Sequence, residues 1–270
     1  MKKALVWIIA VIITLGASYY QRISGPTYPM KISDIPGDAN YSSKLIRSSE
    51  TGEYAHVIID ESSAFDKVLL VYSKYPGEFK NDTIHVKNTG GLWEAYLPDQ
   101  PPAGKLKYYV VLFSNGEEIW SNKDNPAIIR FKDPVPIGVL IPHVLAMLTA
   151  MLFSMVTLFM IILKKGNYKR MSYLTVAVLL VGGFILGPIM QNYAFGEFWT
   201  GWPNGHDFTD NKTLIAFLIW VIAMIINFKK DRKWAIIVAS VSMLIVFSIP
   251  HSMGGSEYNY EEGVVETGNK

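Results

Sequence analysis

The longest stretch without charged residues is the feature that most restricts the fold of this chain. Residues 137–163 contain no Asp, Glu, Lys or Arg. A helix needs roughly 20 apolar residues to cross the hydrocarbon core of a bilayer, so this stretch is long enough. Three more uncharged stretches occupy residues 171–190, 213–228 and 234–250. We therefore predict a membrane α-helical bundle of four transmembrane helices within residues 134–256, with the lipid bilayer as its first partner.

The N-terminus has the pattern of a signal anchor. Lys2 and Lys3 precede the apolar run Ala4–Ala17, and Tyr19 and Tyr20 follow at the level expected for an interfacial aromatic anchor. We predict that residues 1–22 form a signal anchor or transmembrane helix, with a signal peptide as the alternative. In either case the segment that follows is exported.

Basic residues fix the predicted orientation. They form three clusters: Lys2 and Lys3; Lys164, Lys165, Lys169 and Arg170; and Lys229, Lys230, Arg232 and Lys233. The alternation of spans puts all three clusters on one side, which the positive-inside rule assigns to the cytoplasm. We therefore expect a multi-pass protein of the cytoplasmic (inner) membrane with its N-terminus inside. Residues 23–133, the loop 191–211 and the acidic tail 257–270 are then extracytoplasmic, or periplasmic.

Residues 23–133 are expected to form an exported domain made entirely of β-strands. Short runs with strand-like composition alternate with turn signals such as Gly90-Gly91, Pro101-Pro102 and Asn115-Gly116. The predicted strands cover residues 55–59, 68–72, 83–86, 92–97, 106–113 and 127–131. Six or seven short strands in so few residues favour a β-sandwich.

Two adjacent segments, Gly91–Pro98 and Pro102–Val110, resemble the late strands of fibronectin-III-like or other immunoglobulin-like exported domains. The resemblance lies within residues 41–132 and covers about a third of the domain. It implies an immunoglobulin-like sandwich and brings no catalytic residues with it. The aromatic residues Trp93, Tyr96, Tyr108 and Tyr109 are expected in the core and at its rim, with a carbohydrate- or peptide-binding face as the alternative.

Three histidines outside this domain are predicted to lie at the outer face of the membrane. His143 and His251 sit at the outer ends of two spans, and His206 lies in the loop before a third. Asp207 and Glu257 are expected at the same level. Imidazole and carboxylate groups suit a zinc-type site, in which a metal-bound water is the nucleophile and Asp207 or Glu257 is the general base.

The same residues also have structural interpretations. Asp210, or Thr209, can cap the N-terminus of the following helix, and Asp207 can close the turn after Gly205. Glu257 can belong to a solvated acidic tail. The chain contains no HExxH or other compact metal motif.

Two other cofactors remain open. Met147, Met151 and Met155 share one broad helix face with His143, a ligand combination that favours copper(I), although Met is also a common packing residue. His143 and His251 together are sufficient to ligate haem b. The chain has no cysteine, which excludes thiolate ligands and disulfides.

Three functions follow from these patterns. The first is a membrane protein with an outward-facing His/carboxylate site that binds metal and acts on an envelope or lipid-linked substrate. The second is a non-catalytic envelope protein that binds a partner or supports assembly. The third is a copper, haem or redox accessory protein. A nucleic-acid partner is not indicated, because the net charge is only +2.

Overall fold

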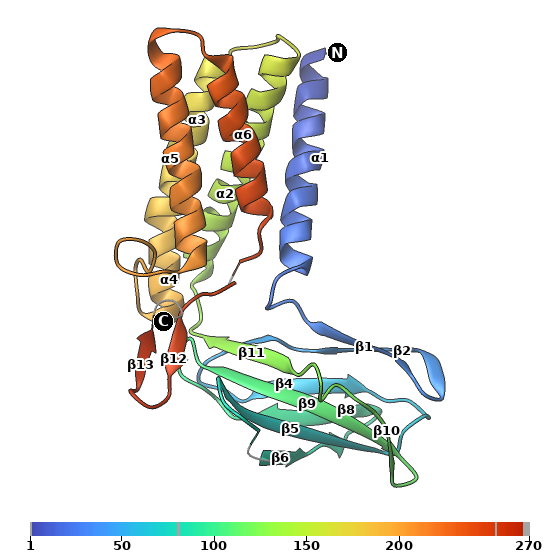
Figure 1. Cartoon of the computed structure of the whole chain (residues 1–270). Helices are drawn as coiled ribbons and strands as arrows, with labels where there is room; N and C mark the ends of the chain where they lie inside the picture. Colours follow the sequence, from blue (N-terminus) through green and yellow to red (C-terminus); the bar gives the residue numbers. More distant parts are fainter. Residues whose placement is uncertain (1, 80–81, 252, 267–270) are drawn as a thin grey trace. The chain divides into compact units, whose positions relative to one another are not determined.

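The computed structural model describes residues 2–79, 82–251 and 253–266, and it divides into two compact units (Figure 1). The helical unit comprises the residues up to Gly25 together with Val135–Gly255. The β unit comprises Pro26–Pro134 together with Ser256–Glu266. The predicted combination of long apolar helices with several β-sheets is therefore confirmed.

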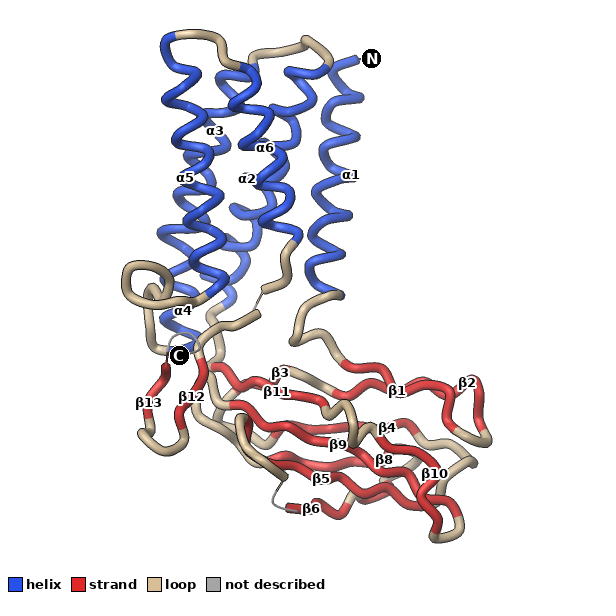
Figure 2. Tube along the Cα trace, viewed as in Figure 1, coloured by secondary structure: helices blue, strands red, loops and turns tan. Residues whose placement is uncertain are grey.

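The helical unit contains six α-helices and one π-helical turn in its described residues (Figure 2). They are α1 (Lys2–Ile23), α2 (Ile137–Ile162), α3 (Tyr168–Leu180), the π-helical turn η1 (Val181–Leu186), α4 (Gly187–Phe195), α5 (Phe208–Lys229) and α6 (Lys233–Ser248). Four segments are long and apolar enough to cross a membrane: Ala4–Ile23, Ile137–Ile162, Tyr168–Phe195 and Phe208–Lys229. This number agrees with a multi-pass membrane protein.

Helix α6 departs from the predicted span 234–250. It has 16 residues and ends at Ser248, where Ile249 turns to an extended conformation. Pro250 follows, and a residue before proline is disfavoured in the helical region. The terminal carbonyls of α6 therefore need partners from outside the helix.

Apolar side chains from α2, α3, α5 and α6 form the main core of the helical unit. Trp220 of α5 is fully buried there, among Met151, Leu179, Ala239 and Met243. A second cluster joins α1 to α2 and α3 through Val6, Ala10, Met155, Val156, Leu158 and Met171. Helix α1 thus packs as a member of the bundle.

Two glycines in η1 allow neighbouring helices to approach closely. A Cβ atom added to Gly182 would lie 2.9 Å from Met147 Sδ on α2, and one added to Gly183 would lie 2.7 Å from Thr213 Cγ2 on α5. Small residues at such positions let helix backbones pack tightly in a membrane. The turn η1 therefore packs closely against both α2 and α5.

The described residues of the β unit form four sheets (Figure 1). The largest has the order β3 (Ser48–Glu50), β11 (Ala127–Lys132), β9 (Lys105–Ser114), β5 (Lys67–Tyr75) and β6 (Asp82–His85), and β10 (Glu117–Ser121) also pairs with β9. The second has the order β4 (Ala55–Asp60), β8 (Leu92–Leu97) and β7 (Lys87–Asn88). Two hairpins, β1 (Met30–Ile35) with β2 (Asp38–Leu45) and β12 (Glu257–Asn259) with β13 (Val264–Glu266), complete the unit. Every pair is antiparallel except β3 with β11.

Side chains from the two larger sheets and the β1–β2 hairpin meet in one core. Period-two alternation places Ala55, Val57 and Ile59 of β4 inside, with His56 and Ile58 outside. All six predicted strand segments fall on strands. Of the four aromatic residues singled out, Tyr108 is fully buried and Tyr109 nearly so, whereas Tyr96 is half exposed.

Candidate functional site

Asp207, predicted as a metal ligand and general base, is the N-cap of α5. Its Oδ1 accepts hydrogen bonds from the backbone N–H of Thr209 at 2.7 Å and of Asp210 at 3.3 Å. The side chain is buried, at 6% exposed. A carboxylate in this position also complements the positive end of the helix dipole. The helix cap is therefore Asp207, and the assignment of that role to Asp210 or Thr209 is wrong.

Asp210 instead holds the preceding loop against α5. Its Oδ2 accepts hydrogen bonds from the backbone N–H of Thr200 at 2.8 Å and of Gly201 at 3.1 Å. Asn211 accepts one from the Trp202 N–H at 2.7 Å. A Cβ atom at Gly201 would lie 2.6 Å from the Asp210 Cβ, so this close approach requires glycine. These contacts give the loop a fixed conformation.

Lys212, in the first turns of α5, is buried in the helical unit. It is 3% exposed, and its Nζ donates to Ile249 O at 2.7 Å and to Pro250 O at 3.4 Å. Gln21 of α1 donates to Phe247 O at 2.6 Å and to Ile249 O at 3.2 Å. Side chains of α1 and α5 therefore bond one terminal carbonyl of α6, that of Phe247, and the carbonyls of the two extended residues that follow the helix.

His143 is held by the π-helical turn. Its Nδ1 lies 3.0 Å from Gly182 O, and because a carbonyl can only accept, Nδ1 is the donor of this hydrogen bond. A Cβ atom at Gly187 would lie 3.6 Å from His143 Cε1, so the ring packs against that glycine. The Gly182 carbonyl also accepts the backbone N–H of Gly187, so the histidine is its second donor at the place where the helical hydrogen-bond pattern changes.

The three predicted histidines do not assemble a metal site. His251 is exposed, although desolvation by its surroundings lowers the pKa of its imidazole and the positive charge of Lys212 lowers it further. His206 is exposed just before the N-cap. Within residues 2–79, 82–251 and 253–266 there is no group of three or more His, Cys, Asp or Glu side chains that could hold a metal ion.

The methionines on the His143 helix are packing residues. Met151 is 3% exposed and Met155 is fully buried, and each belongs to an apolar cluster. Met147 packs at the edge of the main core and touches the position of Gly182. Methionine fills irregular apolar gaps well, which accounts for all three without copper.

Glu257, the second predicted general base, belongs to the β unit and pairs with Lys105. Its Oε1 accepts a hydrogen bond from the Lys105 Nζ at the first residue of β9. Desolvation lowers the pKa of Lys105, and the contact with Glu257 opposes that effect. Within the β unit the carboxylate is therefore the counter-ion of Lys105, and its role as a general base stays a prediction.

The pair belongs to a docked C-terminal hairpin, where the sequence suggested a solvated tail. The Tyr260 hydroxyl donates to Lys105 O and accepts from Lys105 N, both at 3.0 Å. The Tyr258 N–H donates to Ala103 O at 3.2 Å, and Arg130 Nη2 donates to Ser256 O at 2.9 Å. These bonds tie β12 to the start of β9 and to β11.

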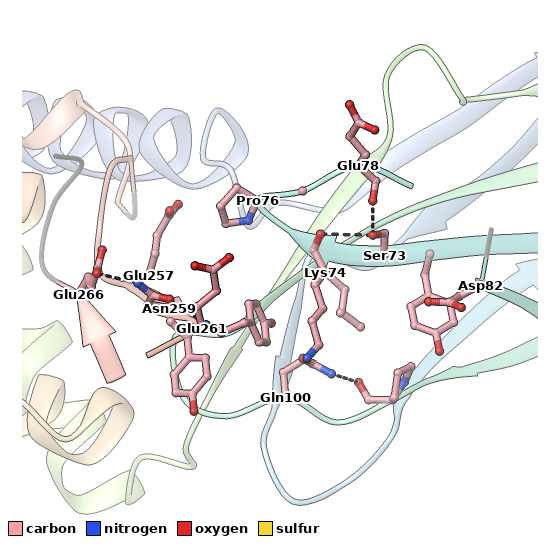
Figure 3. A pocket seen from close by; sticks show the side chains of 16 residues that line it. Ser73, Lys74, Pro76, Glu78, Asp82, Gln100, Glu257, Asn259, Glu261 and Glu266 are labelled. Carbon is pink, nitrogen blue, oxygen red and sulfur yellow. Dashed lines mark hydrogen bonds between the residues drawn. The ribbon is translucent and has the colours of Figure 1, made fainter. Parts of the chain in front are cut away.

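The hairpin forms one wall of a groove of about 840 Å³ in the β unit (Figure 3). The other walls come from β5, the turn after it, and the segment before β9. The volume lies in the range of small-ligand sites, roughly 300–1,000 Å³. The lining residues are Tyr72, Ser73, Lys74, Pro76, Gly77, Glu78, Asp82, Pro98, Gln100, Leu106, Glu257, Tyr258, Asn259, Tyr260, Glu261 and Glu266.

The groove has a strongly negative lining. The described lining residues include five carboxylates and one ammonium, so their formal charge is −4. Glu257 is paired with Lys105, and Glu266 accepts a hydrogen bond from Asn259 Nδ2 at 2.8 Å. This site was not predicted, because one of its walls is a hairpin too short to show a strand pattern; its signal in the sequence is the run of Tyr and Glu between residues 257 and 266.

The β unit is expected to lose stability at alkaline pH. Desolvation raises the pKa of both Tyr41 and Tyr260 to about 12, from an ordinary value of 10.0. Both stay protonated in the folded state while the unfolded chain ionises. The contribution of the two tyrosines to the free energy of unfolding is therefore complete below about pH 10 and is lost as the pH rises through about 12. After allowance for solvent screening, this contribution is on the order of 1 kcal/mol for each side chain.

Unfolding of the full chain in detergent, followed by near-ultraviolet circular dichroism from about pH 8 to about pH 12, measures this loss. The variant Tyr260→Phe should flatten part of the pH dependence. Tyr54→Phe, at a tyrosine that is 67% exposed, is the matched control. A stability of the β unit that does not change over this range would refute the prediction.

Comparisons with protein-family models, with curated proteins and with solved structures found no match for this chain. The class it represents is therefore described by its own architecture: several apolar helices of membrane-spanning length combined with a β unit that carries an acidic groove.

Proposed function

We propose that this chain is a membrane-anchored, non-catalytic binding protein of the cell envelope. Its helical unit spans the cytoplasmic membrane with the N-terminus inside, and its β unit, an immunoglobulin-like sandwich, binds a partner on the extracytoplasmic side. The orientation rests on the three basic clusters, which all fall on one side of the predicted spans.

The observation that carries the proposal is the groove in the β unit. It combines a volume of about 840 Å³ with exposed carboxylates and tyrosine side chains on walls that the Lys105–Glu257 pair and Tyr260 hold together. Concave sites with a few fixed polar groups are the usual places where folded domains bind ligands. The metal-dependent alternative has no comparable support, because the described residues contain no ligand cluster.

Photo-crosslinking in native membranes tests this function. A photoreactive phenylalanine at Glu78 or Glu261, both in the groove lining, should give an adduct with one and the same envelope protein, identified by mass spectrometry. The same substitution at Glu117, an exposed residue of β10 outside the lining, is the matched control. Equal crosslinking from all three positions, or no adduct from the groove positions, would contradict the proposal.

Reporter fusions test the topology separately. Fusions after residues 166 and 231 should report a cytoplasmic location, and a fusion after residue 116 in the β unit should report an extracytoplasmic one. A cytoplasmic β unit would rule out an envelope partner, whatever the groove binds.

A further inference from the structure

We infer that the β1–β2 hairpin of the β unit binds the phosphate groups of anionic lipids, in the membrane that the helices of the same chain span. This inference goes beyond the groove: it rests on the membrane-spanning part of the proposed function and on no property of the groove. Three features support it: a pair of lysines without counter-ions, a partly buried arginine without a hydrogen-bond acceptor, and a short connection to a membrane helix.

The exposed face of the hairpin carries two lysines that lie directly opposite each other. Lys31 of β1 pairs in register with Lys44 of β2, and both are exposed, whereas their neighbours Ile32 and Leu45 are fully buried. Neither lysine forms an ion pair with any described residue. The Cβ atoms of directly opposite residues are about 4.5–5.5 Å apart, and like charges in this position repel. An anion bound by both ammonium groups would offset their repulsion.

Hydroxyl groups accompany the lysine pair. Ser33 and Ser42 are also paired in register, and because side chains alternate along a strand, they lie on the same face as the two lysines. Ammonium and hydroxyl groups are common donors to phosphate oxygens in proteins. The two carboxylates of the hairpin, Asp34 and Asp38, lie near its turn. The open end of the hairpin therefore presents the donors that a phosphate group requires.

Arg47 adds a third cation beside the open end of the hairpin, two residues after β2. It is partly buried, and it forms no ion pair with any described residue. Its Nε is buried without a hydrogen-bond partner in the described part of the chain, and desolvation lowers the pKa of its guanidinium. Removing a charge from water without a counter-ion is costly. An anion at the exposed part of the guanidinium would offset that cost.

The connection to α1 keeps the open end of the hairpin within reach of lipid headgroups. Backbone hydrogen bonds continue the last turn of α1 as far as Gly25, so only residues 26–29 separate it from Met30. Five residues of extended chain span at most about 18 Å. Tyr19 and Tyr20 are exposed near this end of α1, where tyrosines of a membrane helix lie at the level of the headgroups. In any placement of the β unit, its first strand thus begins near the membrane surface.

A fluorescent label on a single introduced cysteine tests the inference, because the chain has no cysteine of its own. The full chain with Ser42→Cys, which keeps both lysines, is labelled and placed in nanodiscs of phosphatidylcholine with or without the anionic lipid phosphatidylglycerol. Quenching by a lipid that carries a nitroxide on its headgroup measures how often the hairpin contacts the headgroups. We expect phosphatidylglycerol to increase this quenching. A label at Glu117→Cys, an exposed position of β10, should show no such increase.

The lysine pair is tested by Lys31→Gln/Lys44→Gln. In nanodiscs with phosphatidylglycerol, this variant should lower the ratio of lipid-bound to free hairpin about fivefold for each lysine. The matched control Lys67→Gln/Lys87→Gln removes two exposed lysines of β5 and β7 and should leave the quenching unchanged.

Added salt should reduce the quenching of the unaltered hairpin, because ions screen exposed charges. Equal quenching with and without phosphatidylglycerol, or quenching that persists in the Lys31→Gln/Lys44→Gln variant, would overturn the inference. Crosslinking from the groove does not depend on these lysines, so either result would leave the proposed binding function to be decided by its own experiment.

Discussion

Replacing Trp220 by alanine should lower the stability of the helical unit by about 3–5 kcal/mol, the usual cost of removing a fully buried large aromatic side chain. Trp220 is the largest of the fully buried side chains and touches the apolar surfaces that α2, α3 and α6 contribute to the main core. Closely packed helices relax only partly into the space that remains, so the lost contacts are not recovered.

Trp220→Phe is the matched control. The indole N–H is buried and has no hydrogen-bond partner among the described residues, so phenylalanine removes an unsatisfied donor while it keeps much of the volume. We expect a change of less than about 1.5 kcal/mol for this variant. Loss of helical circular dichroism during titration with sodium dodecyl sulfate measures both values. Equal stability of the alanine variant and the unaltered chain would show that Trp220 does not organise the core.

Replacing Lys212 by methionine should destabilise the helical unit by about 2–4 kcal/mol. The change removes the side-chain donor to Pro250 O and the shorter of the two hydrogen bonds to Ile249 O, which keeps Gln21 as a donor; a carbonyl left without a partner costs about 1–3 kcal/mol. It also removes a positive charge within electrostatic range of the buried Asp207 carboxylate. Methionine keeps the length of the side chain, so the effect reports the ammonium group.

Lys229→Met, at the opposite and exposed end of the same helix, is the control for Lys212→Met. The same detergent titration should detect almost no change for this variant, because exposed charges contribute little to stability. If the two substitutions have equal effects, the buried ammonium is not what fixes the end of α6.

The elements of the helical unit were largely predictable, because a run without charge has few alternatives to a membrane helix. The residues at which these helices begin and end were harder to predict. Helix α5 begins at Phe208, five residues before the predicted span, and thus includes Asp210 and Lys212. A prediction that excludes charged residues from a membrane span makes the helix too short when its terminal charged side chains are buried. Here Asp210 bonds backbone N–H groups of a loop, and Lys212 bonds backbone carbonyls.

The candidate site was harder to predict than the fold. Asp207 and Asp210 both precede or begin α5, and composition alone does not decide which carboxylate caps the helix and which binds the loop. The strands of the C-terminal hairpin have three residues each, too short to show a periodic pattern. They are held by bonds to a distant part of the chain, which include those of Tyr258, Tyr260 and Glu257.

The capping of α6 has a consequence for how the protein is made. Gln21 is synthesised early, Lys212 much later, and the carbonyls that both of them hold come only at residues 247–250. Until that segment has been synthesised, the Gln21 amide and the Lys212 ammonium lack these hydrogen-bond acceptors. A polar group without a partner costs free energy in lipid. For the membrane-spanning protein proposed above, we therefore expect the helical bundle to become stable only after its last helix and residues 249 and 250 have been synthesised.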